Sequence, residues 1–259
     1  MQNKKDFLDI DGKLFKSRLI MGTSLYPNQK VLKECLEISE TELVTVSIRR
    51  VDLTSKVNIF DDLKKKLTLL PNTAGCYTKK EVLLTAELGR ELIETNLIKL
   101  ELIAEEESLL PNSVELINVA KELIKKNFKV LAYCSDDPIF CKKLEEIGCE
   151  AVMPLVSPIG SGLGIRNEHN LELIRDFCKG KIIVDAGIGK PSDAVRVMEL
   201  GFDAVLLNSA VARSMDPLEM AYAMKLAVKS GRAAFIAGII EKNKYARRSS
   251  PIHGKISNF

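Results

Sequence analysis

Short apolar runs alternate with stretches of helical spacing along the whole chain. The runs are continuous in apolar residues and bounded by turn residues, which is typical of strands covered on both faces. Between them, apolar residues recur every three or four positions, which predicts helices with one buried face. The expected strands are 18–22, 43–48, 66–72, 97–103, 129–134, 151–155, 181–187 and 203–208, and the clearest helices are 31–39, 79–93, 113–126, 138–148 and 191–201.

Eight such strands with helices between them, in 259 residues, favour an α/β protein with a closed (β/α)8 TIM barrel. An open doubly wound sheet is the alternative, but its dinucleotide fingerprint is weak here. The glycines at 160–164 follow a GxGxG spacing instead of the GxGxxG spacing of that fingerprint. Because no low-complexity linker divides the chain, we expect one barrel domain over 1–259. The polar, basic segment from Glu241 is expected to be a partly flexible tail.

The charge balance is nearly neutral, since 38 Lys and Arg against 35 Asp and Glu leave a net charge of +3. Aromatic residues make up only 5% of the chain, and Trp is absent, so we expect no nucleic-acid partner. No segment approaches the roughly 18 unbroken apolar residues of a membrane span. Acidic residues near the N-terminus do not fit a signal peptide. These features predict a cytoplasmic protein without a membrane partner.

Metal and thiol chemistry are disfavoured by the spacing of cysteine and histidine. The chain has six cysteines and two histidines, with no CxxC pair and no zinc-type pattern. A chain of this length does not need disulfides to fold. We therefore interpret most of the cysteines as reduced core residues.

Two charges interrupt the apolar strand 97–103, at Lys99 and Glu101. Strand side chains alternate between faces, so these two residues project to one side and their apolar neighbours to the other. If the apolar set faces the helices, the charged pair lies inside the barrel near its carboxyl-terminal mouth.

A lysine in this position is a candidate Schiff-base nucleophile. Burial lowers the pKa of an amine, and the neutral form attacks a carbonyl. Glu101 could then move protons, although it also favours the charged lysine, so desolvation must outweigh its effect in the free enzyme. The alternative is a structural ion pair that lines the barrel.

Glycines and short polar residues gather in the loops after the last three predicted strands. Six of the 15 glycines fall between positions 160 and 189, and Asn208-Ser209 ends the eighth strand. Barrels frequently bind a phosphate with the loops after strands seven and eight, where glycine lets backbone N–H groups approach an anion. Tight turns without a ligand are the alternative. Asp185, which ends the seventh strand, fits either proton exchange with a substrate or a turn cap.

Several blocks of the chain resemble the thiazole synthases of thiamine biosynthesis. The matching blocks include LLPNTAGCYT at 69–78, AVMPLVSPIGSGLGIRN at 151–167, IIVDAGIGKPSDA at 182–194 and DAVLLNSAVA at 203–212, and LLPNTAGCYT and PIGSGLGI are highly specific. The resemblance runs from about residue 7 to residue 254 and implies the same TIM barrel. It implies Lys99 as the imine-forming residue and Glu101 and Asp185 as acid/base carboxylates. The residues it implies for sugar-phosphate binding are Gly160, Ala186, Gly187, Asn208 and Ser209, the last in place of the family's common threonine.

The resemblance further implies a sulfur-incorporating transferase that rearranges 1-deoxy-D-xylulose 5-phosphate. Sulfur would come from the C-terminal thiocarboxylate of a ubiquitin-like sulfur-carrier protein, and dehydroglycine from a glycine oxidase or a tyrosine lyase. The family implies a homo-oligomer, dimer or tetramer, and no metal or organic cofactor. From the residues alone, a Schiff-base sugar-phosphate aldolase or isomerase, or a non-catalytic scaffold for the carrier, stays open.

Overall fold

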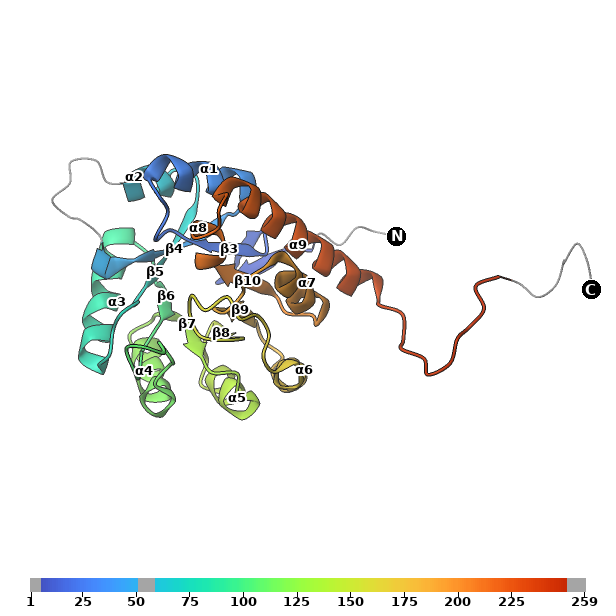
Figure 1. Ribbon diagram of the computed structural model, residues 1–259. Coiled ribbons are helices and arrows are strands. Elements are labelled where there is room, and N and C mark those ends of the chain that lie inside the picture. The colour runs from blue at the N-terminus through green and yellow to red at the C-terminus, as the bar shows by residue number, and fades with distance from the viewer. Residues whose placement is uncertain (1–5, 51–58, 251–259) are drawn as a thin grey trace, which may run out of the picture.

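Eight parallel strands form a closed ring with helices around it (Figure 1). The computed structural model describes residues 6–50 and 59–250. The ring runs in the order β8-β7-β6-β5-β4-β3-β10-β9, and a parallel bridge between Val152 and Ile182 joins its two ends. The strands are β3 (Leu19–Gly22), β4 (Leu43–Ser47), β5 (Thr68–Asn72), β6 (Leu97–Leu100), β7 (Lys129–Cys134), β8 (Ala151–Pro154), β9 (Ile183–Asp185) and β10 (Ala204–Leu207). The predicted TIM barrel is confirmed, each strand lies within its expected range, and the open-sheet alternative is wrong.

The helices follow the strands in turn and cover the outside of the ring. They are α1 (Gln29–Ser39), α2 (Ile59–Lys64), α3 (Lys79–Ile93), α4 (Ser113–Lys125), α5 (Pro138–Glu146), α6 (Glu168–Phe177), α7 (Pro191–Glu199), α8 (Ser209–Ala212) and α9 (Pro217–Ala237), with a 3₁₀ turn at Ile48–Arg50. Local signals set their ends. Thr78 and Glu81 form a capping box at the start of α3. Gly148 and Gly201 follow α5 and α7 with φ of 95° and 86°, as helix-ending glycines do.

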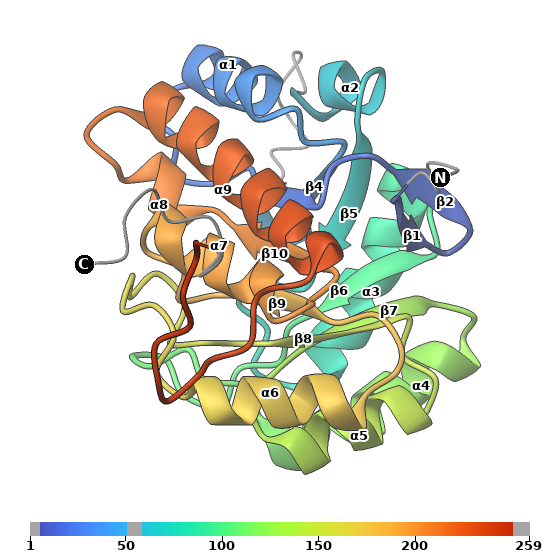
Figure 2. The same cartoon turned by 90° about the vertical axis from the view of Figure 1, so that its right-hand side faces the viewer.

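Helix α9 was not among the predicted helices. Its apolar residues lie on more than one face: Met224 and Val228 are buried, whereas Leu226 is 46% exposed. The sequence of α9 therefore shows no single apolar stripe at helical spacing. In the structure, the helix packs against α7 and α1 (Figure 2). None of the helices in the described ranges is long and apolar enough to cross a membrane.

A short hairpin that the sequence pattern did not predict closes the amino-terminal end of the barrel. Its strands are β1 (Leu8–Ile10) and β2 (Lys13–Phe15), which pair antiparallel. Leu8, Ile10 and Phe15 are buried together with the inward-facing residues of the ring, including Leu97 and Leu131. Figure 2 shows this hairpin at the opposite end of the barrel from α8. The amino-terminal end of the barrel interior is therefore filled with apolar side chains.

An ion-pair cluster ties the segment before the hairpin to α9. The Asp6 carboxylate lies 2.7 Å from the guanidinium of Arg18 and 2.7 Å from that of Arg232. The hydrogen bond from Arg232 has the largest effect on the pKa of Asp6. Together with the hydrogen bond from Arg18 and the charges of both arginines, it outweighs burial and lowers the pKa to about 2. The cluster joins the start of the described chain to α9.

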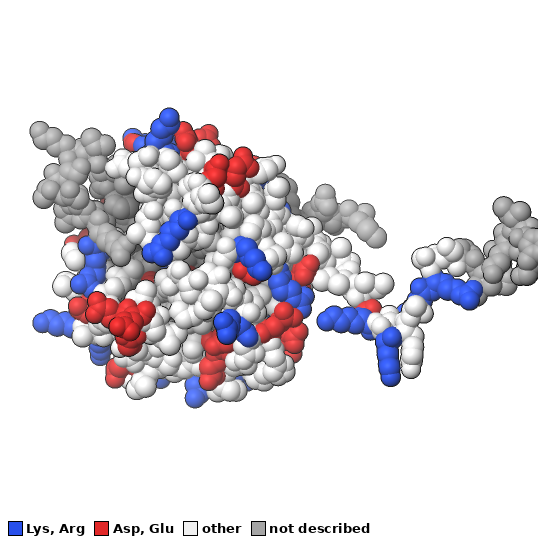
Figure 3. All heavy atoms as spheres, viewed as in Figure 1, with Lys and Arg blue, Asp and Glu red and all other residues white. Residues whose placement is uncertain are grey.

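The surface mixes charges of both signs, and the tail is exposed. On the face in Figure 3, Lys and Arg are interspersed with Asp and Glu. Residues 241–250 form no helix or strand and are exposed, whereas 251–259 lie outside the described residues. All six cysteines are free, and five of them are buried, which confirms the interpretation of reduced core thiols.

Candidate functional site

The side chain of Lys99 lies inside the barrel, between two carboxylates. Its Nζ is 2.7 Å from Asp185 Oδ2 and 3.2 Å from Glu101 Oε2, and each of the three residues is at most 5% exposed. Ile98 and Leu100 instead belong to the outer core beneath the helices, as the predicted alternation requires. The placement of the charged pair inside the barrel is confirmed.

Glu101 lies one residue beyond the end of β6, which stops at Leu100 rather than at the expected residue 103. Thr73, just after β5, holds the backbone at this point. Its hydroxyl donates to the Glu101 carbonyl oxygen at 2.8 Å and accepts from the Glu101 N–H at 2.8 Å. The carboxylate is thereby fixed above Lys99, although the regular ladder has ended.

The electrostatics of this cluster differ from the expectation of a neutral lysine. Burial by itself lowers the pKa of Lys99, but the charges of Asp185 and Glu101 outweigh it and raise the pKa above its ordinary value. Burial raises the pKa of Asp185, although Lys99 opposes this. The prediction of an uncharged amine in the free site is therefore wrong. The resting cluster holds an ammonium, and the neighbouring Asp185 has a higher than usual affinity for a proton.

The loops after β8, β9 and β10 meet beside this cluster. Ala186 has a φ of 80°, which is uncommon for a residue with a side chain, and Gly187 follows with a φ of 86°. A side chain at Gly187 would collide with Ser157 of the loop after β8. Gly160 also has a positive φ, of 71°. Gly187 therefore has no room for a side chain, whereas Gly160 favours glycine because of its backbone angle alone, since the atom nearest to a Cβ there would be 3.5 Å away.

Asn208 and Ser209 complete this group of loops after β10. The Asn208 amide donates to the Ser24 carbonyl oxygen at 2.9 Å, and its own Oδ1 is buried without a hydrogen-bond partner in the described chain. Gly22, at the end of β3, leaves the space for this side chain, since a Cβ there would lie 2.7 Å from Asn208 Cβ. Ser209 Oγ lies beside Gly160.

All eight residues singled out in the sequence line one cavity of about 420 Å³, here called the central cavity. This volume is in the range of small-molecule sites. The cavity brings a lysine, two carboxylates and a group of open backbone loops within reach of one small molecule. Its predicted members are Lys99, Glu101, Asp185, Gly160, Ala186, Gly187, Asn208 and Ser209.

Further polar residues that line the same cavity were not predicted from the sequence. Asn72 ends β5 and is 8% exposed, and its Oδ1 has no hydrogen-bond partner among the described residues; the buried Ser47 Oγ is likewise unpartnered. The ring of Tyr133 lies 5.3 Å from Lys99 Nζ. A polar residue at the carboxyl end of a barrel strand was an available signal for Asn72 and Ser47. Unpartnered polar atoms at a cavity wall are groups that a ligand can satisfy.

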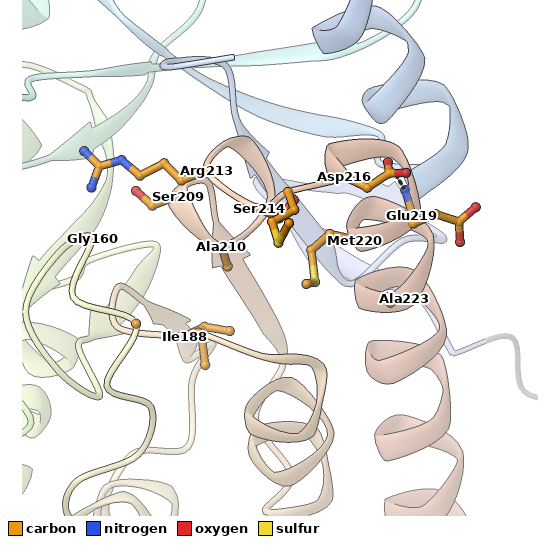
Figure 4. A pocket seen from close by; sticks show the side chains of 13 residues that line it. Gly160, Ile188, Ser209, Ala210, Arg213, Ser214, Asp216, Glu219, Met220 and Ala223 are labelled. Carbon is orange, nitrogen blue, oxygen red and sulfur yellow. Dashed lines mark hydrogen bonds between the residues drawn. The ribbon is translucent and has the colours of Figure 1, made fainter. Parts of the chain in front are cut away.

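A second, larger cavity of about 730 Å³ adjoins the first, and we call it the outer cavity. The two share Gly160, Ile188, Ser209, Ala210 and Arg213. Figure 4 shows it between the loops at Gly160 and Ile188, α8 and the start of α9. It contains none of the three charged residues of the barrel interior, so the reactive groups belong to the central cavity alone.

Comparisons with known proteins agree on one family. The family described as "Thiazole biosynthesis protein ThiG" matches residues 9–251. The chain is 50% identical over 261 residues to a thiazole synthase of Geobacter sulfurreducens, covering 99% of this chain and 100% of the relative. It is 49% identical over 252 residues to one of Aquifex aeolicus, covering 96% and 94%.

Among solved structures, the BexX/CysO complex of Amycolatopsis orientalis is similar in fold. The TM-score is 0.83 at 24% sequence identity, and the match covers 93% of this chain and 100% of the other. A thiamine phosphate pyrophosphorylase of Pyrococcus furiosus is similar with a TM-score of 0.55 at 16% identity, over 82% and 95% of the two chains. Both likenesses concern the barrel.

Proposed function

The chain belongs to the thiazole synthase family of thiamine biosynthesis, and from this membership we propose how its central cavity carries out the reaction. The family is one of sulfur-incorporating transferases. This membership favours thiazole synthesis over the alternative functions that the residues alone left open, namely a Schiff-base aldolase or isomerase and a non-catalytic scaffold. The proposed substrate is 1-deoxy-D-xylulose 5-phosphate, and the single observation that carries the proposal is a buried lysine held between two carboxylates in the central cavity.

The first proposed step is the release of the Lys99 amine from its charged form. Asp185 lies 2.7 Å from the ammonium, and its pKa is raised by burial, so it is suited to take that proton. The transfer converts an ion pair into two neutral groups, which is cheaper in a buried site than separating the charges. The free amine then adds to the C2 ketone of the sugar, and loss of water gives an imine on Lys99.

The carboxylates then move protons on the bound sugar. Removal of the proton at C3 of the sugar imine gives an enaminol, and return of a proton to C2 leaves a ketone at C3 and a C2 carbon joined to Lys99 by a single C–N bond. Glu101, 3.2 Å from Lys99 Nζ, and Asp185 are the proposed acid/base pair for this tautomerisation. The loops at Gly160, Ala186-Gly187 and Asn208-Ser209 are proposed to hold the phosphate.

Sulfur enters in the next proposed step, from a C-terminal thiocarboxylate on a ubiquitin-like carrier protein. Addition of dehydroglycine, supplied by a glycine oxidase or a tyrosine lyase, then closes the thiazole ring. BexX, the similar structure, is itself described in a complex with a second protein, CysO. The chain is proposed to act as one cytoplasmic barrel domain over residues 1–259, with its tail from Glu241, in a homo-oligomer.

Borohydride trapping tests the imine. Treating the protein with 1-deoxy-D-xylulose 5-phosphate and borohydride should reduce the imine to a stable amine and add the mass of the reduced sugar to the peptide that contains Lys99. Lys99→Arg should give no adduct, whereas Lys142→Arg, on the exposed face of α5, should react like the wild type. An adduct on another residue, or none, would refute the proposed mechanism.

Reconstitution tests the complete reaction. The protein is supplied with the pentulose phosphate, the thiocarboxylated carrier and a source of dehydroglycine, and thiazole phosphate is measured. Omission of the thiocarboxylate should abolish the product, which an aldolase or isomerase would not require. Lys99→Ala should abolish the product while carrier binding survives, a combination that contradicts a scaffold role.

A further inference from the structure

Arg213 is a cation at the junction of the central and outer cavities that none of the site predictions includes. It follows α8, and its backbone N–H donates to the Ser209 carbonyl oxygen at 3.0 Å. Its Nη1 lies 3.5 Å from the position that a Cβ on Gly160 would occupy, and Ser209 Oγ lies 3.6 Å from the same point. The guanidinium and the serine hydroxyl therefore both lie against the Gly160 loop.

The charge of Arg213 is available to a ligand. No ion pair or hydrogen bond of its guanidinium occurs within the part of the chain that the structure describes, and the residue is exposed. Figure 4 shows the guanidinium directed past Ser209 toward the Gly160 loop, with Asp216 and Glu219 at the other end of the outer cavity. One Asp216 oxygen also accepts from two backbone N–H groups at the start of α9. The acidic residues of this cavity are thus not placed to neutralise Arg213.

The barrel interior needs such a charge to accept an anion. Lys99 is surrounded by Glu101 and Asp185, so this cluster carries one positive and two negative charges. A phosphate monoester with nearly two negative charges would be repelled by the excess. Among the described residues that line the two cavities, Lys99 and Arg213 are the cations, and only Arg213 lacks a carboxylate partner.

We propose that Arg213 binds the phosphate group of the substrate, together with the Ser209 hydroxyl and the backbone at Gly160. The planar guanidinium can donate two parallel hydrogen bonds to phosphate oxygens, which fixes both the position and the direction of the sugar. The residue thereby distinguishes a phosphorylated ketose from the same ketose without phosphate. The inference rests on the proposed function in that it takes a phosphorylated ketose as the ligand of this cavity.

Calorimetric titration with inorganic phosphate at low ionic strength tests the site without catalysis. Arg213→Ala should weaken phosphate binding about tenfold, the loss expected for one charge-assisted contact at an exposed position. Arg213→Lys should lose less, because it keeps the charge but not the paired geometry. Lys142→Ala removes the same charge far from the cavities and should bind as the wild type does. Equal phosphate affinity in the wild type and Arg213→Ala, or no phosphate binding by the wild type, would overturn the proposal.

Trapping with two sugars separates this proposal from the function on which it rests. With 1-deoxy-D-xylulose 5-phosphate, Arg213→Ala should need about tenfold more sugar for half-maximal adduct on Lys99, with the same final yield. With unphosphorylated 1-deoxy-D-xylulose, the wild type and Arg213→Ala should be trapped equally. An unchanged requirement for the phosphorylated sugar overturns the role of Arg213. Absence of any Lys99 adduct in the wild type refutes the proposed function, whereas the phosphate titration still decides the role of Arg213.

Discussion

Replacing Lys99 by methionine should make the stability of the protein depend steeply on pH. Methionine keeps an unbranched side chain of similar length but removes the charge. Lys99 is 3% exposed, and its Nζ lies 2.7 Å from Asp185 and 3.2 Å from Glu101, so Lys99→Met leaves two buried carboxylates without a cation. Breaking a buried ion pair from one side typically costs about 3–5 kcal/mol.

The direction of the pH effect follows from Asp185. Burial and Glu101 raise its pKa, and only the charge of Lys99 lowers it, so the pKa rises further in the variant. A carboxyl group with a raised folded-state pKa stabilises the fold at low pH, and this contribution is lost as the pH rises above the unfolded-state value. For each proton that the folded state keeps and the unfolded state has lost, the free energy of unfolding falls by about 1.4 kcal/mol per pH unit. Between pH 5 and pH 7 this amounts to about 2.7 kcal/mol.

Urea denaturation at pH 5, 6, 7 and 8 measures this effect. Lys99→Met should be closest to the wild type at pH 5 and fall progressively further below it toward pH 8. Lys99→Met combined with Asp185→Asn should recover stability at pH 8, because the asparagine removes one of the unpaired charges. Lys142→Met, the same change on an exposed face, should stay within about 0.5 kcal/mol of the wild type. A Lys99→Met protein whose stability relative to the wild type is the same at pH 5 and pH 8 would show that the three groups are not buried together.

Three other substitutions test the ion-pair cluster at Asp6, the loop at Gly187 and the wall of the central cavity at Asn72. Asp6→Asn should lower the free energy of unfolding by about 1 kcal/mol at pH 7. The difference should shrink as the pH falls below about 4 and vanish below about pH 2, because a carboxyl with a depressed folded-state pKa loses its stabilising effect as the pH falls through that pKa; acid-dependent thermal melts measure this. Gly187→Ala should cost at least about 2 kcal/mol more than Gly148→Ala in urea denaturation, since both have a positive φ but only Gly187 is blocked, by Ser157; equal costs would refute the close packing of the loops. Asn72→Leu should leave the melting temperature unchanged or higher, because it removes an unpartnered buried amide, while it lowers kcat/KM for the sugar phosphate; an unimpaired enzyme would contradict a ligand-binding role for Asn72.

Strand alternation alone was sufficient to place Lys99 and Glu101 inside the barrel. Each barrel strand carries its own signal in a run of apolar residues, and the period of two assigns the faces within it. The same pattern does not reveal the hairpin, whose strands have three residues each and too few positions to establish a period. Helix α9 was missed for the related reason that its apolar residues do not form one stripe.

The protonation of Lys99 could not be predicted from the strand in which it lies. Among the charges that raise the pKa of Lys99, that of Asp185 contributes most. Asp185 ends β9 and lies 86 positions further along the chain. Only the closed ring brings the two within 2.7 Å. Arg213 escaped notice similarly, because nothing in its local sequence distinguishes it from a surface arginine. Its place beside Gly160 depends on how three separate loops meet.

The hairpin that closes the amino-terminal end of the barrel determines from which side ligands can reach the central cavity. With Leu8, Ile10 and Phe15 packed into the base, the described chain offers no passage along the barrel axis from that side. Under the proposed function, the sugar, the sulfur donor and the nitrogen donor enter, and the product leaves, at the carboxyl-terminal end of the barrel. A sugar bound deep in the central cavity lies beneath the reactants that bind after it. The simplest kinetic scheme is therefore a compulsory order of binding in which the sugar binds first.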